Sequence, residues 1–512
     1  MTDGKQKTRT AAIMGGLMLG MLLSALDQTI VGTAMPRIIM NLGGMALYSW
    51  VFSAYMLTAT ATVPVVGKLS DLYGRRWFYV GGLGIFMLGS VLCGAAQTME
   101  QLIVFRGLQG IGAGAVMPLT IAIIGDIVAP SERGKLQGLM GTVFAFASVV
   151  GPMAGGLIVD NWNWRWVFYV NLPVGLLSLL VMLLVLHDIK DGIDARSIDY
   201  LGVMALVPAI TTMLLVTIWG GKDYAWDSLP IIGLGVVSLL LWLLFVYVEM
   251  RAKEPIIPFS LFRNSVFTVS SVAVFLTGIG MFGAIMFIPL FVQGVIGTSA
   301  TDSGMVLTPM MLSFVGSSVV AGQIMSRTGK YRHIALVALG IVSFAFYLLA
   351  GMGVETSNEV AVRNVVVLGL GMGALMPLFN LAVQNAVEHR VMGIATSCIQ
   401  FFRGVGATVG VTVMGALMAS RVDGGMRLGL AGLPAEVTAN LSMSELRAML
   451  SPEATLARGG TVDLPQAVVE IAKAVLAGAL HDVFYVGLVV AVLALGVCLF
   501  LKEIPLKRQA RR

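Results

Sequence analysis

The stretch GIGAGAVMPL at residues 110–119 returns as GLGMGALMPL at residues 369–378, with seven of the ten positions identical. A weaker match joins GKLSDLYGRR at 67–76 to GQIMSRTGKY at 322–331. The two matches run in the same order, and their offsets of 259 and 255 residues nearly agree. Repetition at one spacing indicates that a chain is built from related structural units. The sequence therefore predicts two related halves.

Around these repeats the chain is apolar throughout. Hydrophobic residues make up 57% of its 512 positions and charged residues only 12%, against about 25% charged in a soluble domain. Fourteen apolar runs have the length of about 20 residues that a helix needs to cross a bilayer. In chain order they cover residues 11–35, 49–66, 78–97, 101–126, 138–159, 165–186, 200–219, 229–249, 267–292, 304–325, 333–353, 362–386, 392–419 and 480–501. Two neighbouring runs could merge, which leaves twelve or thirteen spans open. We expect an all-α polytopic membrane protein with fourteen transmembrane helices.

Fourteen spans divide into two bundles of six and one extra pair. The first bundle takes residues 1–190, and the second takes residues 253–512. Spans seven and eight fall between them, within residues 191–252. They are predicted to form an inserted transmembrane hairpin.

Positive charges give the orientation of this bundle. If the N-terminus is cytoplasmic, the inner segments hold 22 Lys and Arg residues, and the short outer loops hold four. Such an excess marks the cytoplasmic side of a membrane protein, so both termini are expected in the cytoplasm. The net charge of +6 is then a feature of topology, and no nucleic-acid partner is expected.

Two segments are amphipathic and do not read as spans. Residues 254–267, EPIIPFSLFRNSVF, are predicted to lie along the inner surface before span nine. The second segment, PQAVVEIAKAVLAGAL at 465–480, belongs to a long outer loop over residues 420–480. Interfacial helices of this kind often serve packing. The second one could be a structural cap, or a lid that guides a ligand.

Asp27 is a carboxylate inside the first apolar run, which continues to Arg37 without another charge. A charge at such depth is costly and usually functional. Arg106 lies inside span four at a comparable depth, since Asp27 is about 12 Å and Arg106 about 8 Å from the outer boundary at 1.5 Å of rise per residue. An ion pair or a shared water network between them is predicted. The alternative is that Arg106 extends to the outer interface.

The short inner turn between spans two and three carries an acid, two glycines and two arginines in close succession. Gly67 and Gly74 permit tight turns, and Asp71 can bond a helix end or pair with Arg75 and Arg76. A bundle that changes conformation needs contacts made in one state and broken in the other. The second copy has a serine in place of the acid, so we expect a one-sided latch.

Span five contains the run GPMAGG, with Gly151, Pro152, Gly155 and Gly156. Glycine and proline in a membrane helix allow bending and close packing against a neighbour. A plain packing motif remains the alternative.

Arg403 lies near the middle of span thirteen with no acid in its own helix. It could bind an anionic group, or it could hold the halves together through glutamine and carbonyl partners. Further polar residues are expected to line a central cavity with it: Gln28, Tyr55, Asn380, Gln384 and Gln400.

Enzyme signatures are missing from the sequence. It has neither a phosphate loop of the GxxxxGK[ST] type nor an HExxH motif, and its four histidines lie at span boundaries. No cofactor or metal is expected. Any uphill transport would have to be driven by an ion gradient.

These residues resemble the major facilitator superfamily, and within it the 14-span drug/proton antiporters of the EmrB/QacA type. The resemblance rests on LDQTIVGTAMPRI (26–38), GKLSDLYGRR (67–76), RGLQGIGAGAVMP (106–118), GPMAGG (151–156), WRWVFYVNLPVG (164–175) and RGVGATVG (403–410). It implies the major facilitator fold, with two six-helix bundles around a cavity that opens to each side in turn. Unlike some relatives, the chain shows no acid in the middle of spans ten or thirteen.

The resemblance also implies roles for individual residues. Asp27 would carry a proton or contact substrate, and Arg106 would assist proton coupling. The loop from Gly67 to Arg76 would gate the inner face, and the run Gly151–Gly156 would mark an antiporter.

The function that follows is proton-driven export of lipophilic, cationic drugs through the cytoplasmic membrane of a bacterium, by a monomer. The partners would be the small lipophilic substrate, protons and the lipid bilayer. Dedicated export of a lipid or an antibiotic-like metabolite is the alternative. A receptor or scaffold without turnover is a third class, but it does not explain Asp27, Arg106 and the inner turn together.

Overall fold

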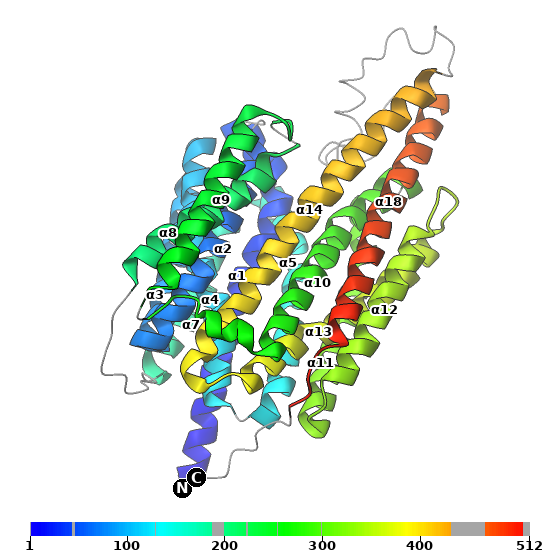
Figure 1. The fold of residues 1–512 in the computed structure, drawn as a ribbon. Coiled ribbons are helices and arrows are strands. Elements are labelled where there is room, and N and C mark those ends of the chain that lie inside the picture. Colours follow the sequence, from blue (N-terminus) through cyan, green and yellow to red (C-terminus); the bar gives the residue numbers. More distant parts are fainter. Residues whose placement is uncertain are drawn as a thin grey trace.

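The protein is a bundle of long, steeply inclined helices (Figure 1). The structure, a computed structural model, describes residues 2–43, 47–128, 130–186, 199–221, 224–252, 254–297, 300–431 and 466–504. Within these residues fourteen helices are long and apolar enough to cross a membrane. The predicted all-helical fold with fourteen spans is therefore confirmed.

The first half of the chain supplies six spans. They are formed by α1 (Thr2–Leu42), α2 (Tyr48–Tyr73), α3 (Arg75–Ala95), α4 (Met99–Ile127), α5 (Pro130–Asn161) and the pair α6 (Trp166–Tyr169) and α7 (Asn171–Val185).

The hairpin and the second half follow in order. The hairpin consists of α8 (Tyr200–Trp219) and α9 (Leu229–Glu249). The second half contains α10 (Ser265–Phe291), α11 (Ala300–Thr328), α12 (Arg332–Ala350), α13 (Asn358–Ala386), α14 (Met392–Ala431) and α18 (Gln466–Cys498).

Equivalent positions of the two halves have equivalent local structure. Gly74 ends α2 with a φ of 98°, and Gly329, 255 residues later, follows α11 with a φ of 70°. Side chains with a Cβ atom rarely adopt positive φ, so glycine is favoured at both joints. Thr98 and Ser357, 259 residues apart, cap the N-termini of α4 and α13 with their hydroxyl oxygens.

Packing between helices repeats at the same offsets. The Thr58 hydroxyl of α2 donates to the Gly107 carbonyl of α4 over 2.7 Å. In the second half the Ser313 hydroxyl of α11 donates to the Val366 carbonyl of α13 over 3.0 Å. The residue pairs are again 255 and 259 positions apart, so the sequence repeat corresponds to one structural unit used twice.

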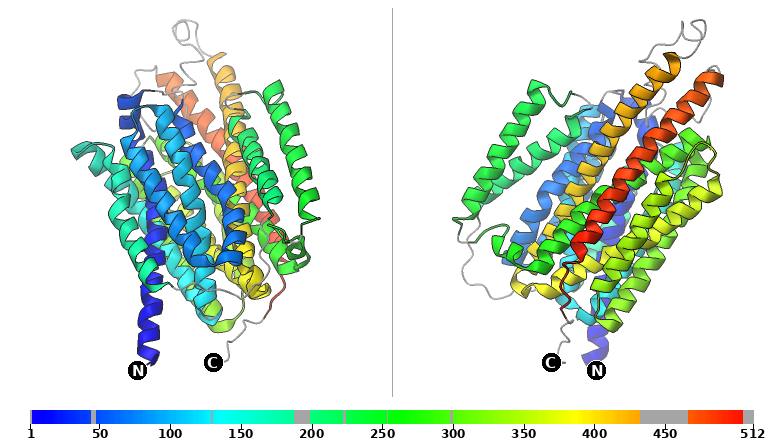
Figure 2. Two further views of the ribbon diagram at one scale, coloured as in Figure 1. Left: turned by 90° about the vertical axis from the view of Figure 1, so that its left-hand side faces the viewer. Right: turned by 45° about the vertical axis from the view of Figure 1, so that its right-hand side comes forward.

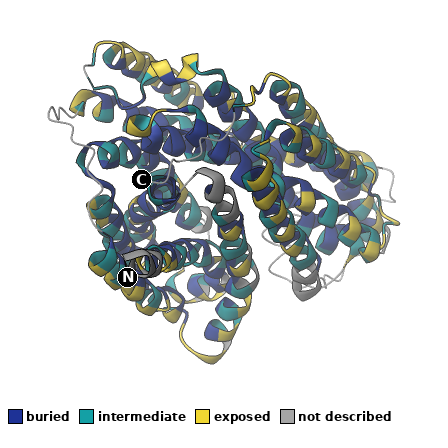
Figure 3. Ribbon diagram, turned by 90° about the horizontal axis from the view of Figure 1, so that it is seen from below, coloured by how far each residue is buried: buried dark blue, intermediate teal, exposed yellow. Residues whose placement is uncertain are grey.

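The halves meet where α5 packs against α11 and α2 packs against α14. The hairpin lies beside this junction, because α8 contacts both α2 and α14 (Figures 1 and 2). Most of α9 is exposed, which suits a helix turned to lipid. We call the end of the bundle where α1 begins and α18 ends the terminal face. Seen from that face, buried residues follow the interior sides of the helices (Figure 3).

The outer segment predicted as a long loop over 420–480 is partly helical. α14 continues to Ala431, and α18 begins at Gln466 and runs through the predicted cap at 465–480 into the last span. The two long helices pack together, with an ion pair of 2.7 Å between Arg421 and Asp482. Hydropathy predicts where a helix leaves the membrane, whereas the helix itself can continue beyond that point, as α14 and α18 do. Residues 432–465 of the predicted loop lie outside the described residues.

The inner segment at 254–267 contains a short 3-10 turn, Phe259–Arg263, and the first residues of α10. Asn264 then caps the first span of the second half through its Oδ1, which accepts from Val266 N over 3.0 Å. Ile256 and Ile257 are buried, and Ile257 N donates to Glu249 Oε1 over 2.5 Å. The segment is thereby anchored to the end of the hairpin.

Candidate functional site

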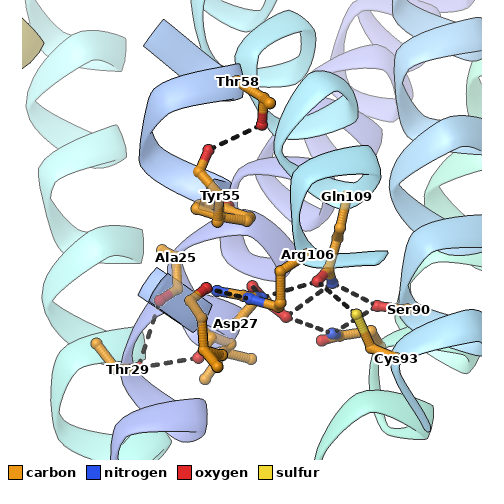
Figure 4. Close-up of polar contacts among 12 residues, drawn as sticks. Ala25, Asp27, Thr29, Tyr55, Thr58, Ser90, Cys93, Arg106 and Gln109 are labelled. Carbon is orange, nitrogen blue, oxygen red and sulfur yellow. Dashed lines mark hydrogen bonds and ion pairs between the residues drawn. The ribbon is translucent and has the colours of Figure 1, made fainter. Parts of the chain in front are cut away.

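Asp27 lies at the centre of a buried polar cluster between the helices of the first half (Figure 4). Its Oδ2 pairs with Arg106 Nη1 of α4 at 2.5 Å. Its Oδ1 accepts from Gln109 Nε2 at 2.8 Å and from Asn171 Nδ2 of α7 at 3.1 Å. The Asp27 side chain is 0% exposed and that of Arg106 is 1% exposed. The predicted pair is present, and Arg106 does not extend to a membrane surface.

Arg106 is held from several directions. Besides Asp27, its Nη1 donates to Gln109 Oε1 over 2.7 Å, and its Nε donates to the Val51 carbonyl over 3.3 Å. The guanidinium carbon lies 4.2 Å from the centre of the Tyr55 ring, in a cation–π contact. These partners come from α1, α2 and α4, so one guanidinium fixes three helices.

Ser90 of α3 completes the cluster. Its Oγ accepts from Gln109 Nε2 at 2.7 Å and from Asn171 Nδ2 at 3.0 Å. Removing one partner of a buried ion pair costs about 3–5 kcal/mol, because the remaining charge is left without compensation.

Gln109, Asn171 and Ser90 were not predicted as site residues. Gln109 could have been predicted from the sequence, because it follows Arg106 by three residues and residues three apart lie on the same face of a helix. Asn171 and Ser90 are single polar residues in apolar spans. Such residues tend to face the bundle interior, although their partner cannot be identified without the rotation of each helix.

A cavity of about 170 Å³ lies between the two halves, near the middle of the spans. Ser24 and Gln28 line it from α1, and Arg403 and Gln400 line it from α14. The remaining lining is apolar or weakly polar: Met56, Ala59, Thr60, Val63, Ala113, Gly114, Met117, Pro118, Phe144, Thr277, Gly278, Met281, Phe282, Met372, Leu375, Met376, Phe379 and Gly404.

Three residues predicted to line this cavity are placed elsewhere. Tyr55 packs on Arg106 inside the first half. Asn380 bonds within α13, from its Nδ2 to the Met376 carbonyl over 3.3 Å. Gln384 lies nearer the terminal face and donates to the Ile121 carbonyl of α4 over 3.1 Å, so it joins the halves. Asp27 is also not among the residues that line the cavity.

Asp71 forms part of a contact between the halves at the terminal face. Its Oδ2 accepts from the backbone N–H of Ile394, at the start of α14, over 2.7 Å. Its Oδ1 pairs with Arg75, and Arg75 Nε also pairs with Asp126 of α4 at 2.8 Å. Asp71 and Arg75 are both 6% exposed. A charged acceptor shortens and strengthens a bond to a backbone N–H group, so this residue ties α2 to α14.

Of the other residues in the predicted inner turn, Gly67 packs against the second half, while Gly74 and Arg76 make contacts within the first half. Gly67 lies so close to α14 that a Cβ atom would clash with Ser397. Gly74 makes the joint between α2 and α3. Arg76 does not join the latch, because its Nη2 donates to the Leu183 carbonyl of α7 over 2.6 Å.

A second bridge lies beside this latch. Glu254, in the segment after the hairpin, pairs with Lys68 of α2 at 3.0 Å and with Arg390 at 2.7 Å. Because Arg390 precedes α14, this carboxylate joins both halves to the linker. We refer to the contacts of Asp71, Glu254 and Gln384 as the terminal-face latch.

The glycine run of α5 packs on α1. A Cβ atom at Gly151 would clash with the Thr29 hydroxyl, and one at Gly155 would clash with Thr33 and the Ile30 carbonyl. Gly156 has open space at its Cβ position. Two glycines of the run therefore permit close approach of α5 to the helix that carries Asp27, as small residues commonly do between membrane helices. The side chain of Pro152 lies outside the described residues.

Comparisons with known proteins agree with this architecture. Residues 17–411 match the sequence model of the Major Facilitator Superfamily. The Multidrug transporter protein MdtP of Bacillus subtilis is 42% identical, over 99% of this chain and 95% of that protein. Multidrug resistance protein 3 of the same organism is 36% identical, over 99% of this chain and 98% of that protein.

The fold is also similar to a solved structure. The crystal structure of the human organic anion transporter MFSD10 (TETRAN) covers 94% of this chain and 99% of its own, with a TM-score of 0.61 and 14% identity. At that identity the likeness concerns the fold alone.

Proposed function

Because this chain belongs to the major facilitator superfamily, we propose that it exports lipophilic compounds by alternating access, driven by protons. It is a transporter and not an enzyme. The proposal places it as a monomer in the cytoplasmic membrane of a bacterium, with both termini in the cytoplasm.

The observation that carries the proposal is the cavity between the two related halves. It lies near the middle of the spans, and the terminal-face latch joins the halves on one side of it. Secondary transporters bind substrate near the bilayer midplane at the interface of their repeats. If the latch broke and the ends of the halves far from the terminal face came together, the same cavity would open to the terminal face.

The cavity lining supports a broad range of lipophilic substrates. Five methionines contribute to it: Met56, Met117, Met281, Met372 and Met376. Methionine is flexible and polarizable, so it adapts to ligands of different shape. The relatives named for multidrug transport and multidrug resistance are consistent with this breadth.

Proton coupling is assigned to the Asp27 cluster. A proton on Asp27 removes the charge that compensates Arg106 and replaces an acceptor by a donor, so the bonds to Gln109 and Asn171 must rearrange. This weakens the tie of α1 to α4 and α7. A proton and a substrate in the cavity would not compete directly for this carboxylate, because Asp27 does not line the cavity. The proton would instead act through α1, whose Ser24 and Gln28 do line it.

The test replaces Asp27 by asparagine, which nearly keeps the shape and removes the titration. Purified Asp27→Asn in liposomes with an imposed proton gradient should not concentrate substrate, while downhill exchange of substrate survives. Glu100→Gln, at the exposed start of α4, removes an acid outside the cluster and serves as the matched control. Uphill export by Asp27→Asn at the rate of the unmodified protein would remove Asp27 from the coupling mechanism.

A further inference from the structure

Arg403 is the charged side chain among the residues that line the central cavity. It lies on α14, partly exposed, and faces a lining that is otherwise apolar or carries only hydroxyl and amide groups. None of the described lining residues is a carboxylate. The fixed charge of the cavity, as far as the structure describes it, is therefore positive.

The Arg403 guanidinium has no hydrogen bond or ion pair with any residue in the described part of the chain, in contrast to Arg106 and Arg75. The sequence also raised a structural alternative, in which Arg403 joins the halves through glutamine and carbonyl partners; no such partner is found among the described residues. Ionisable groups within membrane spans usually pair with one another or with carbonyl groups. A cation left without such a partner beside a cavity has its donors free for a ligand.

Two amides accompany this cation. Gln400 precedes Arg403 by three residues, on the same face of α14, and also lines the cavity. Gln28 reaches the cavity from α1 in the other half. Side-chain amides both donate and accept hydrogen bonds, so they can complete the shell of an oxyanion whose main contact is the guanidinium.

The rest of the lining suits the hydrocarbon body of such a ligand. Phe282 and Phe379 supply aromatic rings, and the methionines supply adaptable apolar surface. A dry apolar cavity of about 150 Å³ is large enough for benzene. The present cavity of about 170 Å³ is of the size of an aromatic ring system.

We propose that this cavity prefers lipophilic anions, such as aryl carboxylates and sulfonates, over lipophilic cations, and that Arg403 binds the anionic group. The inference rests on the export function proposed above and narrows its substrate class. Arginine matches an oxyanion with two parallel N–H donors, whereas a ligand cation in the same place meets a like charge in a medium of low dielectric constant.

The test uses two probes with the same ring and charges that do not depend on pH, naphthalene-2-sulfonate and 2-naphthyltrimethylammonium. Equilibrium binding to the purified protein is measured for each. The sulfonate should bind at least tenfold more tightly than the ammonium compound. Arg403→Gln should abolish that difference, and Arg403→Lys should retain part of it, because lysine keeps the charge but loses the planar fork.

Two controls accompany these variants. Arg263→Gln, on the 3-10 turn before α10 and exposed, removes one positive charge outside the cavity and should leave both affinities unchanged. Thermal unfolding of Arg403→Gln should match that of the unmodified protein, because the guanidinium has no hydrogen-bond or ion-pair partner among the described residues. Equal binding of the two probes, no binding of the sulfonate, or an unchanged preference in Arg403→Gln would each overturn the proposal.

Transport assays separate this inference from the export function. If the sulfonate binds through Arg403 but no proton gradient moves it across liposomes, the cavity preference stands and the export function fails. If the ammonium probe is exported and Arg403→Gln does not affect that export, the export function stands and the anion preference fails.

Discussion

Replacing Asp71 by asparagine should open the terminal face of the protein. The variant keeps the size of the side chain but replaces a charged acceptor for Ile394 N–H by a neutral one, and it removes the pair with Arg75. Hydrogen bonds to charged groups contribute about 1.5–3 kcal/mol and neutral ones about 0.5–1.5 kcal/mol. Arg75 keeps its pair with Asp126, which limits the loss.

We therefore expect the latched state to lose roughly 1–3 kcal/mol relative to the state in which this face is open, a shift of about 5- to 150-fold in the ratio of the two. Turnover should slow, because the state with the terminal face closed is less populated. Substrate affinity should change much less, since Asp71 does not line the cavity.

The assay is a distance measurement between the halves by double electron–electron resonance. Spin labels replace Trp77 in α3, which is 57% exposed, and His333 at the start of α12, whose side chain is 73% exposed. Both positions follow the inner turn of their half, so latch opening should add a population at longer distance. The native cysteines Cys93, Cys398 and Cys498 are buried and should label slowly.

Ser326 provides the matched control. It is the residue equivalent to Asp71 in the second half, and among the described residues its hydroxyl bonds to Gln323 within its own helix, over 2.9 Å. Ser326→Ala should leave the distance distribution unchanged. An unchanged distribution in Asp71→Asn, or an equal shift in Ser326→Ala, would refute the assignment of the latch.

Three further expectations follow from the packing and topology. Gly114→Val should lower the melting temperature strongly, because a Cβ atom there would meet the Ala59 carbonyl of α2, while Gly81→Ala, with open space at its Cβ position, should have little effect. Glu254→Gln should open the terminal face less than Asp71→Asn, because partly exposed ion pairs contribute only about 0–1 kcal/mol. A single cysteine replacing Leu428, which is 80% exposed on α14, should react with an impermeant thiol reagent on intact cells; labelling only after lysis would contradict the proposed orientation.

The parts of the site that the sequence predicts are those that depend on depth alone. Asp27 and Arg106 lie at comparable depth because the rise of a helix is constant, so counting residues from span ends was enough to pair them. The repeat of the α2 and α4 segments likewise predicted that α11 and α13 pack together in the same way, because identical small residues allow identical close contacts between helices. The excess of Lys and Arg beside the spans predicts that both termini are cytoplasmic, and this orientation stays a prediction.

Residues whose placement depends on helix rotation were predicted less well. Gln109, Asn171 and Ser90 meet at Asp27 only because three helices turn the corresponding faces inward. Asn380 and Gln384 share a polar character with Gln400, yet the packing of α13 places them away from the cavity lining. Hydropathy gives the length of a span and says little about which face meets which neighbour.

Asp27 and Gln28 are adjacent in sequence, but one is enclosed by the first half and the other faces the central cavity. Successive residues of an α-helix point about 100° apart, so a proton on Asp27 and a substrate beside Gln28 would occupy different sides of one helix without sharing an atom. If a proton and a substrate competed for one carboxylate, the apparent dissociation constant of the substrate would rise tenfold for each unit by which the pH falls, without limit, over the range in which the free carboxylate is mostly protonated. Thermodynamic linkage through α1 instead reaches a plateau set by the coupling free energy, and the same factor governs the effect of substrate on proton affinity. A pH titration of substrate binding therefore distinguishes coupling through α1, in which the dissociation constant reaches a plateau, from direct competition at a shared carboxylate, in which it does not.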